Sequence, residues 1–568
     1  MAKKDYTNWD RKDLVNEIEQ LRKRKKYGLV WEDKPEDVVE QCKNELPILE
    51  EVKDKEISTD PDKPTNLLIE GDNYHALSVL NYTHKGKIDV IYIDPPYNTG
   101  AKDWKYNNHY VDENDTYRHS KWISMMNNRL KIAKNLLKKD GVLICTIDKN
   151  ENATLLLLLE EIFPNHDITS VVIEHNPKGL PSRNFSYSHE YAHFVIPKNK
   201  SVIGKNPATK IDTRNLRRAG RASYRTERPT MFYPIYIKDG NVVRIGKVPK
   251  DSYHPKKRSI VNESGEIEIW PIDDKGQERR WHFGLDSIED HLDRIEVKEK
   301  NGDFQLYVTA VPARYKTVWT GGDFDAGKYG TSLVRDIIDK EFPFPKSLHA
   351  TEKCIETVIY ERDNAIVLDF FAGSGTTGHA VMMMNEQYGG NRKFILCTNN
   401  ELNSQENKLR AKGLSEEEME EYGICRAITY PRIKKVIEGY SNVSGIKSNL
   451  KYFKTSFVPA DPTDKNKVAI TKKATAMLCV KEDTFDEVKS TNRYQIFRNK
   501  KRHTGIIFDH LAISEFKSEI AKIDGKFSVY VFSLGDDTFD EEFEDIKDKV
   551  KLSPIPEAIL RVYRRIFK

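Results

Sequence analysis

An aspartate, two prolines and a tyrosine stand together at residues 94–97, directly after the apolar run KIDVIYI. Two adjacent prolines fix φ at both positions and supply no backbone N–H, so the chain becomes rigid where the run ends. Asp94 and Tyr97 are therefore held in one arrangement, a carboxylate beside an aromatic ring. Such a pair can accept hydrogen bonds from an amine while the ring stacks on the flat group that carries it. The alternative is a proline-rich turn with no chemistry.

The chemistry that fits this pair is activation of an exocyclic amine on a nucleobase. The lone pair of such an amine is delocalised into the ring, which makes the nitrogen a poor nucleophile. Asp94 and the carbonyl of Pro95 can accept the two amine hydrogens, which draws the nitrogen toward a tetrahedral geometry and frees its lone pair. Tyr97 can stack on the base. A base in a duplex reaches such a pocket only after it leaves the helix, at a cost of roughly a few kcal/mol.

A second motif, LDFFAGSGTT at residues 368–377, has the pattern of a strand that ends in an aspartate, a glycine turn and the start of a helix. Glycines there let the backbone approach a ligand closely. The motif lacks the full dinucleotide fingerprint, and a tight turn without a ligand is the alternative. Glu401 follows the next strand, in a position to accept hydrogen bonds from ribose hydroxyls. Together these features predict a site for an adenosine-type cofactor that carries no pyrophosphate.

Strands and helices that alternate along the chain are expected to position both motifs. Strands are predicted at 67–70, 87–94, 141–148, 170–175 and within 364–369 and 392–398, and helices at 73–80, 121–138 and 153–163. This alternation predicts an open α/β sheet with helices on both faces, whose ligands lie at the carboxyl ends of the strands. Asp72, Asp94 and Asp148 all fall at such ends.

Residues 200–340 interrupt the alternation with short apolar pieces in which basic and aromatic residues are mixed. We predict that they form an inserted domain that selects a nucleic-acid sequence. Arginine forks suit phosphates and guanine edges, although a charge run is more often a solvated loop. The arginines expected at the nucleic acid are Arg214, Arg217, Arg218, Arg221, Arg225 and Arg228.

Composition narrows the class of protein. The 568 residues carry a net charge of +4, and no apolar run approaches the roughly 20 residues of a membrane span. The N-terminus has no apolar segment of the signal-peptide type, so a cytoplasmic protein is expected. The six cysteines have no metal-binding spacing, and no metal is expected. GDFDAGKY at 322–329 spells part of a nucleotide-binding loop, but Tyr329 stands where that loop needs Ser or Thr.

The two ends of the chain add further elements. Residues 10–27 have the spacing of an amphipathic helix, which motivates a homodimer as a hypothesis. Short β-like pieces and a closing helix at the C-terminus predict a small α+β domain. The expected organisation is an N-terminal helical segment at 1–50, a catalytic half at 51–200, a target recognition domain at 201–340, a cofactor-binding half at 341–440 and the α+β domain at 441–568.

The order of these motifs resembles that of the beta-class amino-methyltransferases. The motifs are GDNYHAL, YIDPPYNTG, KWISMMNNRL, FSYSHEYAHFV, RPTMFYPI, FPFPKSLHATEKCIE and LDFFAGSGTT. In that class the catalytic motif precedes the cofactor loop, and target recognition is inserted between them. Over most of its length the chain also resembles the modification (Mod) subunit of a type III restriction–modification system. The resemblance implies a Rossmann-like fold and S-adenosylmethionine as the cofactor.

It also implies roles for individual residues. Asp94, Pro95, Pro96 and Tyr97 would form the target-amine site. The residues expected around the methionine end of the cofactor are Asp369, Phe371, Gly373 and Gly375, with Lys346 nearby and Glu401 on the ribose. Either Tyr191 or Phe194 could add a second aromatic wall, or both could belong to the core of a strand.

The expected activity is methyl transfer to the 6-amino group of adenine in double-stranded DNA, with base flipping. Methylation of the 4-amino group of cytosine is the close alternative. A recognition subunit that guides a partner nuclease–helicase is another, and so is an RNA or protein methyltransferase that shares the fold. A restriction subunit is the partner that the resemblance implies, since the sequence itself contains no recognisable nuclease pair.

Overall fold

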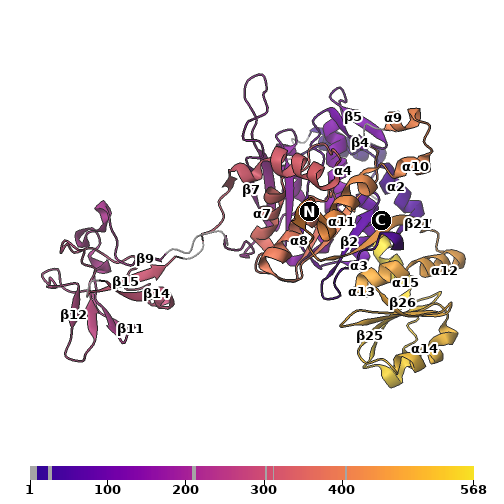
Figure 1. Ribbon diagram of the computed structural model, residues 1–568. Coiled ribbons are helices and arrows are strands. Elements are labelled where there is room, and N and C mark those ends of the chain that lie inside the picture. Colours follow the sequence, from indigo (N-terminus) through magenta and orange to yellow (C-terminus); the bar gives the residue numbers. More distant parts are fainter. Residues whose placement is uncertain are drawn as a thin grey trace. The chain divides into compact units, whose positions relative to one another are not determined.

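The apolar runs of the sequence form one ten-stranded sheet in the computed structural model (Figure 1). The structure describes residues 9–23, 29–206, 213–300, 303–310, 313–402 and 406–567. The chain divides into two compact units, one made of Met1–Gly204 with Lys316–Lys568 and the other of Lys205–Tyr315.

Three late strands, β21, β18 and β17, lie among the early strands in the large sheet. In order across the sheet, its strands are β1 (Glu45–Glu51), β21 (Asn449–Pro459), β2 (Thr65–Glu70), β18 (Lys393–Thr398), β17 (Ile366–Asp369), β3 (Ile88–Ile93), β6 (Leu137–Ile147), β8 (Glu190–Pro197), β7 (His166–Ile173) and β16 (Val318–Trp319). The five strands from β2 to β6 in this order are parallel. β17 pairs with β3 through Val367–Val90 and Leu368–Ile91, so the residues that follow these two strands emerge side by side at one edge.

Helices cover both faces of this sheet, as the sequence predicted. One face carries α3 (Asn73–Thr83), α4 (Arg118–Ala133) and α5 (Asn152–Ile162), and the other carries α7 (Leu348–Ile359), α8 (Thr376–Tyr388) and α11 (Tyr430–Glu438). Side chains of one strand alternate between the two cores, so Leu67 and Ile69 of β2 belong to the first and Leu68 to the second.

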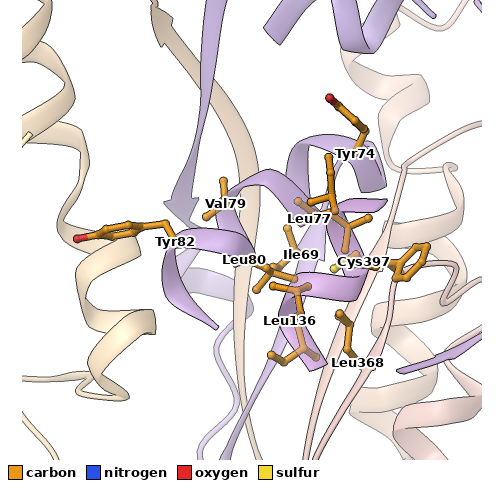
Figure 2. Close-up of a cluster of buried hydrophobic side chains, with 14 of the residues drawn as sticks. Ile69, Tyr74, Leu77, Val79, Leu80, Tyr82, Leu136, Leu368 and Cys397 are labelled. Atoms are coloured by element: carbon orange, nitrogen blue, oxygen red, sulfur yellow. The ribbon is translucent and has the colours of Figure 1, made fainter. Parts of the chain in front are cut away.

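Figure 2 shows part of the first core, where Leu77 and Leu80 of α3 lie near Ile69 and Leu368. A fully buried leucine of this kind stabilises the fold by about 2–3 kcal/mol. Asp72 caps α3 by accepting a hydrogen bond from the backbone N–H of Tyr74 at 2.7 Å. The helix predicted at 121–138 is shorter than expected, because α4 ends at Ala133 and β6 already begins at Leu137.

The C-terminal α+β domain starts later than the sequence suggested, because β21 is a strand of the large sheet. Its own sheet has the order β22 (Asp486–Ser490), β23 (Tyr494–Arg498), β24 (His503–Ile507), β25 (Phe527–Phe532) and β26 (Val550–Ile555). Its helices are α12 (Asp464–Lys473), α13 (Thr475–Glu482), α14 (Ile513–Ile520) and α15 (Glu557–Ile566). Both α13 and α15 pack against α3, so this domain is part of the first unit.

The second unit holds two small sheets. They contain β10 (Ile235–Lys238), β11 (Asn241–Ile245), β12 (Ser259–Val261) and β13 (Ile267–Ile269), and then β9 (Thr213–Asn215), β14 (Ile295–Lys300) and β15 (Asp303–Thr309). Trp281 and Tyr233 are buried in its core. The unit is narrower than the predicted 201–340, because residues from Lys316 onward belong to the first unit. There GDFDAGKY forms a 3-10 turn and the start of a π-helical turn.

The first unit contains further helices and strands. They are α1 (Arg11–Lys23), α2 (Asp37–Asn44), β4 (Ala101–Tyr106), β5 (His109–Asp112), α6 (Leu333–Ile338), α9 (Glu406–Ala411), α10 (Glu416–Glu420), β19 (Gly439–Tyr440) and β20 (Val443–Ser444). The predicted amphipathic helix is thus present as α1, and residues 24–27 of that prediction lie outside the described residues. No helix in the described part of the chain is long and apolar enough to span a membrane.

Candidate active site

The aspartate–proline–tyrosine turn at residues 94–97 follows β3, and hydrogen bonds from neighbouring side chains hold it in place. Asn98, with φ of 55°, is buried and donates to Glu151 Oε1 at 2.5 Å while it accepts from Trp104 Nε1 at 3.1 Å. Trp122 Nε1 donates to the carbonyl of Pro96 at 2.6 Å. These contacts fix the backbone on both sides of Tyr97. The sequence-based prediction assigned no role to Asn98 or Trp122. For Asn98 the available signal was its place after the turn, because asparagine tolerates positive φ.

The carboxylate of Asp94 is held by two donors on other strands and loops. Thr146 Oγ1, on β6, donates to Asp94 Oδ1 at 2.7 Å, and the ammonium of Lys346 lies 3.2 Å from the same oxygen. The Asp94 side chain is 24% exposed, so it is reachable from the carboxyl edge of the sheet. Thr146 and Lys346 both contact Oδ1. With respect to the described residues, Oδ2 is therefore left to accept a hydrogen bond from a ligand.

A buried glutamate completes this cluster. Glu190, the first residue of β8, accepts from Tyr97 OH at 2.9 Å and forms an ion pair with Lys346, whose ammonium also contacts Tyr97 OH. The ammonium lies 4.4 Å from the centre of the Tyr97 ring. His175 Nδ1 is 3.6 Å from Glu190 Oε2. Sequence reasoning missed Glu190, and the available signal was an acid at the start of the apolar strand EYAHFVIP.

Burial and the Lys346 charge set the protonation of this cluster. Burial raises the pKa of Asp94, and Lys346 only partly opposes that effect. Burial also acts to raise the pKa of Glu190, but the nearby ammonium outweighs it and the net pKa is lowered. The pKa of Lys346 is raised in spite of burial, because Asp94 and Glu190 both favour its charged form. The result is an ammonium that stays charged between two carboxylates.

The two aromatic candidates on β8 have different surroundings. Phe194 is buried in the second core, with its ring centre 6.2 Å from that of Trp319. Tyr191 is partly buried, contacts His189 through its hydroxyl at 3.3 Å and stacks on His193. Phe194 therefore belongs to the strand core, and the structure leaves Tyr191 as the candidate wall.

The glycine turn follows β17, the strand beside β3. Asp369 is buried, and its two oxygens accept from the backbone N–H of Phe371 at 2.9 Å and from Thr377 Oγ1 at 2.6 Å. Burial raises the pKa of Asp369 to about 7, although both of these donors oppose the shift. Asp369 thus ties the turn to the start of α8. Gly373 and Gly375 have φ of 49° and 80°, which glycine adopts without strain.

The surroundings of the turn fit a cofactor with a ribose and an amino-acid end. A Cβ on Gly373 would lie 3.5 Å from the ring of Phe342, so a side chain there would fill the space beside that ring. Glu401 follows β18, and its Oε1 accepts from Asn399 Nδ2 at 2.5 Å. Burial raises the pKa of Glu401. The chemistry of this donor and acceptor set fits the predicted cofactor.

One short segment connects the turn to the target site. Phe342 lies against Gly373, and Lys346, four residues later, lies against Asp94 and Glu190. The charge of Asp94 also contributes to the raised pKa of Asp369. The structure therefore places Lys346 in the Asp94 cluster, and its expected place near the methionine end of the cofactor stays a prediction. The two motifs, about 275 positions apart in the sequence, meet at one edge of the sheet.

The arginine run lies in the second unit and has two kinds of members. Arg225 is buried, and its guanidinium donates to the carbonyls of Tyr253 and Lys250 and to Glu278. That arginine holds the domain together. Arg217 is half-buried, whereas the exposed members are Arg214, Arg218, Arg221 and Arg228.

Within the described ranges, no group of three or more His, Cys, Asp or Glu residues could hold a metal ion. All six cysteines are free and buried. Cys145 and Cys397 belong to the first core, where they pack as small apolar residues.

Comparison with known proteins gives consistent matches over this site. A family model described as DNA methylase matches residues 88–401, more than half of the 568-residue chain. The type II methyltransferase M.KpnI of Klebsiella pneumoniae is 31% identical over 360 residues, which cover 60% of this chain and 82% of that protein. The type III restriction-modification enzyme EcoPI Mod subunit of Escherichia phage P1 is 30% identical over 388 residues, 59% of this chain and 58% of that subunit.

A third relative is the EcoP15I Mod subunit of Escherichia coli, 27% identical over 386 residues, which cover 58% of each chain. The match thus spans less than two thirds of these Mod subunits. Among solved structures, the cytosine-N4-specific PvuII DNA methyltransferase aligns with a TM-score of 0.30 at 13% identity, over 65% of this chain and 93% of that one.

Proposed function

Since the chain belongs to the DNA methylase family, we propose that it methylates the 6-amino group of adenine within a specific sequence of double-stranded DNA. The chain is a DNA amino-methyltransferase, and S-adenosylmethionine is its methyl donor. The observation that carries the proposal is the pairing of β3 with β17, which brings Asp94 and the Gly373 turn to one edge.

The residues of the Asp94 cluster have distinct tasks in this reaction. An extruded base stacks on Tyr97, and Asp94 Oδ2 accepts one amine hydrogen. The carbonyl of Pro95 accepts the other, because the carbonyl of Pro96 is already bonded to Trp122. Lys346 and Thr146 hold Oδ1 and so fix the direction in which Oδ2 points. These contacts position and polarise the amine, which is where most of the rate enhancement of such a transfer arises.

The methyl donor and the proton are handled by different residues. Asp369, Phe371, Gly373, Gly375 and Glu401 would hold S-adenosylmethionine, which supplies an electrophilic methyl group when bound. The amine nitrogen would gain the methyl group as the S–CH3 bond of the bound donor breaks and leaves a thioether. The nitrogen would give up a proton, and Asp94 Oδ2 is placed to take it. The raised pKa of Asp94, a consequence of burial, strengthens it as that acceptor.

The choice of adenine rests on the aspartate that opens the DPPY motif, and cytosine is the alternative. Mass analysis of nucleosides from DNA incubated with the full chain and S-adenosylmethionine tests this choice. We expect N6-methyladenine with the wild type and none with Asp94→Ala. A product that consists only of 4-methylcytosine would contradict adenine and leave the amino-methyltransferase intact.

We also propose that the enzyme is the modification subunit of a type III system, that it works in the cytoplasm and that a restriction subunit is its partner. Support comes from the relatives named as type III Mod subunits. The second unit is proposed to choose the target sequence through the exposed arginines of its run. Exchanging residues 205–315 for those of a relative should change the site that is methylated. An unchanged site would refute this assignment.

A homodimer remains a proposal, motivated by the exposed Leu14, Val15 and Ile18 of α1. Light scattering of the full chain tests it. A recognition subunit without catalysis is the competing function. It would be favoured if Asp94→Ala left methylation equal to that of the wild type.

A further inference from the structure

The segment between β7 and β8 leaves the carboxyl edge of the sheet as an ordered hairpin. Ile173 and Glu190 are the last pair of residues in the two strands. Beyond them, the backbones of Leu180 and Tyr187 exchange two hydrogen bonds of 2.7 and 3.0 Å, and Asn176 N–H donates to the carbonyl of Ser188 at 3.0 Å. Residues 174–189, here called the β7–β8 hairpin, rise from the end of β7 in Figure 1.

The tip of this hairpin is apolar and exposed. Phe185 is 75% exposed and Leu180 is 56% exposed, so neither ring nor methyl groups serve the core. Exposed apolar residues that a fold does not bury mark interaction sites when polar residues surround them. The surrounding side chains include those of Ser182, Arg183 and Asn184.

The charges of the hairpin favour an anionic partner. Lys178 and Arg183 are exposed. The acidic residue in 174–189 is Glu174, which lies at the foot of the hairpin. Lys149, which follows β6, lies 3.3 Å from the centre of the Tyr187 ring and adds another cation beside the hairpin. Basic side chains around exposed apolar groups suit a duplex, whose phosphates attract the cations while its base steps accept an apolar wedge.

The feet of the hairpin belong to the catalytic cluster. Glu190 contacts Tyr97 and Lys346, and His175 Nδ1 lies 3.6 Å from Glu190. The carbonyl of His175 also accepts from the N–H of Ala326 at 2.9 Å, which fixes that foot on the body of the unit. A group that enters the duplex at the tip is therefore connected by one short β-ladder to the residues that receive the base.

We propose that the β7–β8 hairpin inserts Phe185 into double-stranded DNA at the space that the extruded base leaves. This inference rests on the proposed function, because it assigns the hairpin to the same reaction. The cations position the hairpin on the backbone, and the ring replaces the stacking that the neighbours of the target base lose. Phe185 thereby raises the fraction of time that the base spends in the Tyr97 pocket.

Two duplexes separate this role from a contact that only adds affinity. Both duplexes carry the target sequence. In the first the target base is paired, and in the second it faces an abasic site and is already unpaired. Single-turnover methylation is measured at saturating full-length enzyme for the wild type, Phe185→Ala, Phe185→Trp and Leu511→Ala. Leu511 is a matched control, because it is 74% exposed and lies in the C-terminal domain.

On the paired duplex we expect Phe185→Ala to be slower than wild type by about tenfold or more, the size of one lost stacking contact. On the abasic duplex the rate of Phe185→Ala should lie within about twofold of the wild-type rate. Phe185→Trp and Leu511→Ala should have rates near that of the wild type on both duplexes. With 2-aminopurine at the target position, Phe185→Ala should also show a smaller rise in fluorescence on binding.

Equal rates for Phe185→Ala and wild type on the paired duplex, or equal losses on the two duplexes, would overturn the wedge while wild-type activity stands. If the wild type methylates neither duplex, the proposed function fails and the wedge fails with it.

Discussion

Replacing Lys346 with methionine removes the ammonium that lies between Asp94 and Glu190, and the structure allows the cost to be worked out. The ammonium is 3.2 Å from Asp94 Oδ1 and in direct contact with Glu190, which is only 2% exposed. Two unit charges about 4 Å apart attract by about 4 kcal/mol at an effective dielectric constant near 20. Breaking a buried pair by removing one partner typically costs about 3–5 kcal/mol, because it leaves a buried charge unpaired. We therefore expect Lys346→Met to lower the free energy of unfolding by about 3–5 kcal/mol.

The double variant Glu190→Gln/Lys346→Met should recover roughly 2 kcal/mol or more of this loss, because glutamine is neutral and still accepts from Tyr97 OH. Urea unfolding at pH 7, followed by tryptophan fluorescence, measures both variants. Lys473→Met is the control, since its pair with Glu50 at 3.3 Å is half exposed and worth about 0–1 kcal/mol. The reasoning is refuted if Lys346→Met costs no more than Lys473→Met, or if the double variant is as unstable as the single one.

Three further predictions concern the turn, a strained residue and the arginine run. The folded-state pKa of Asp369, about 7, lies above its unfolded value, so the stability it contributes is full below about pH 4 and is lost as pH rises to 7. The free energy of unfolding of Asp369→Asn, relative to that of the wild type, should therefore rise by up to about 4 kcal/mol between pH 4 and 8 in urea titrations. A difference between the two proteins that does not change with pH would contradict this. Phe344 has φ of 53° and is 89% exposed, so Phe344→Gly should be more stable than Phe344→Ala by about 1 kcal/mol in thermal unfolding. Arg225→Ala should destabilise the second unit by about 2–4 kcal/mol, while Arg218→Ala should stay within about 0.5 kcal/mol and instead lower the salt dependence of DNA binding. The opposite pattern in these two variants would reverse their assigned roles.

The sequence was most informative where local patterns decide the structure. The strand before Asp94, the helix after Asp72 and the glycine turn at Gly373 all occur as predicted, because apolar patterns and glycine's tolerance of positive φ are local effects. The chemistry of Asp94 and Tyr97 could be inferred for the same reason. Two rigid prolines fix their relation before any tertiary contact forms.

Contacts between distant segments could not be read in this way. The neighbours of Asp94 come from β6, from β8 and from the segment before α7, and no periodicity shows that Glu190 and Lys346 meet there. The same limit explains β21, whose residues were expected in the C-terminal domain but pair with β1 and β2. Arg225 looked like its neighbours in the run, and only its burial distinguishes it.

The most direct test of the account is a structure of the full chain with S-adenosylhomocysteine and a duplex that contains its target. The central claim is that the Asp94 cluster and the Gly373 turn form one site for a base and a methyl donor. We predict an extruded base on the ring of Tyr97, its amine within hydrogen-bond distance of Asp94 Oδ2, and the cofactor against the Gly373 turn. A target base that stays stacked in the duplex, or a cofactor bound away from that turn, would contradict the claim.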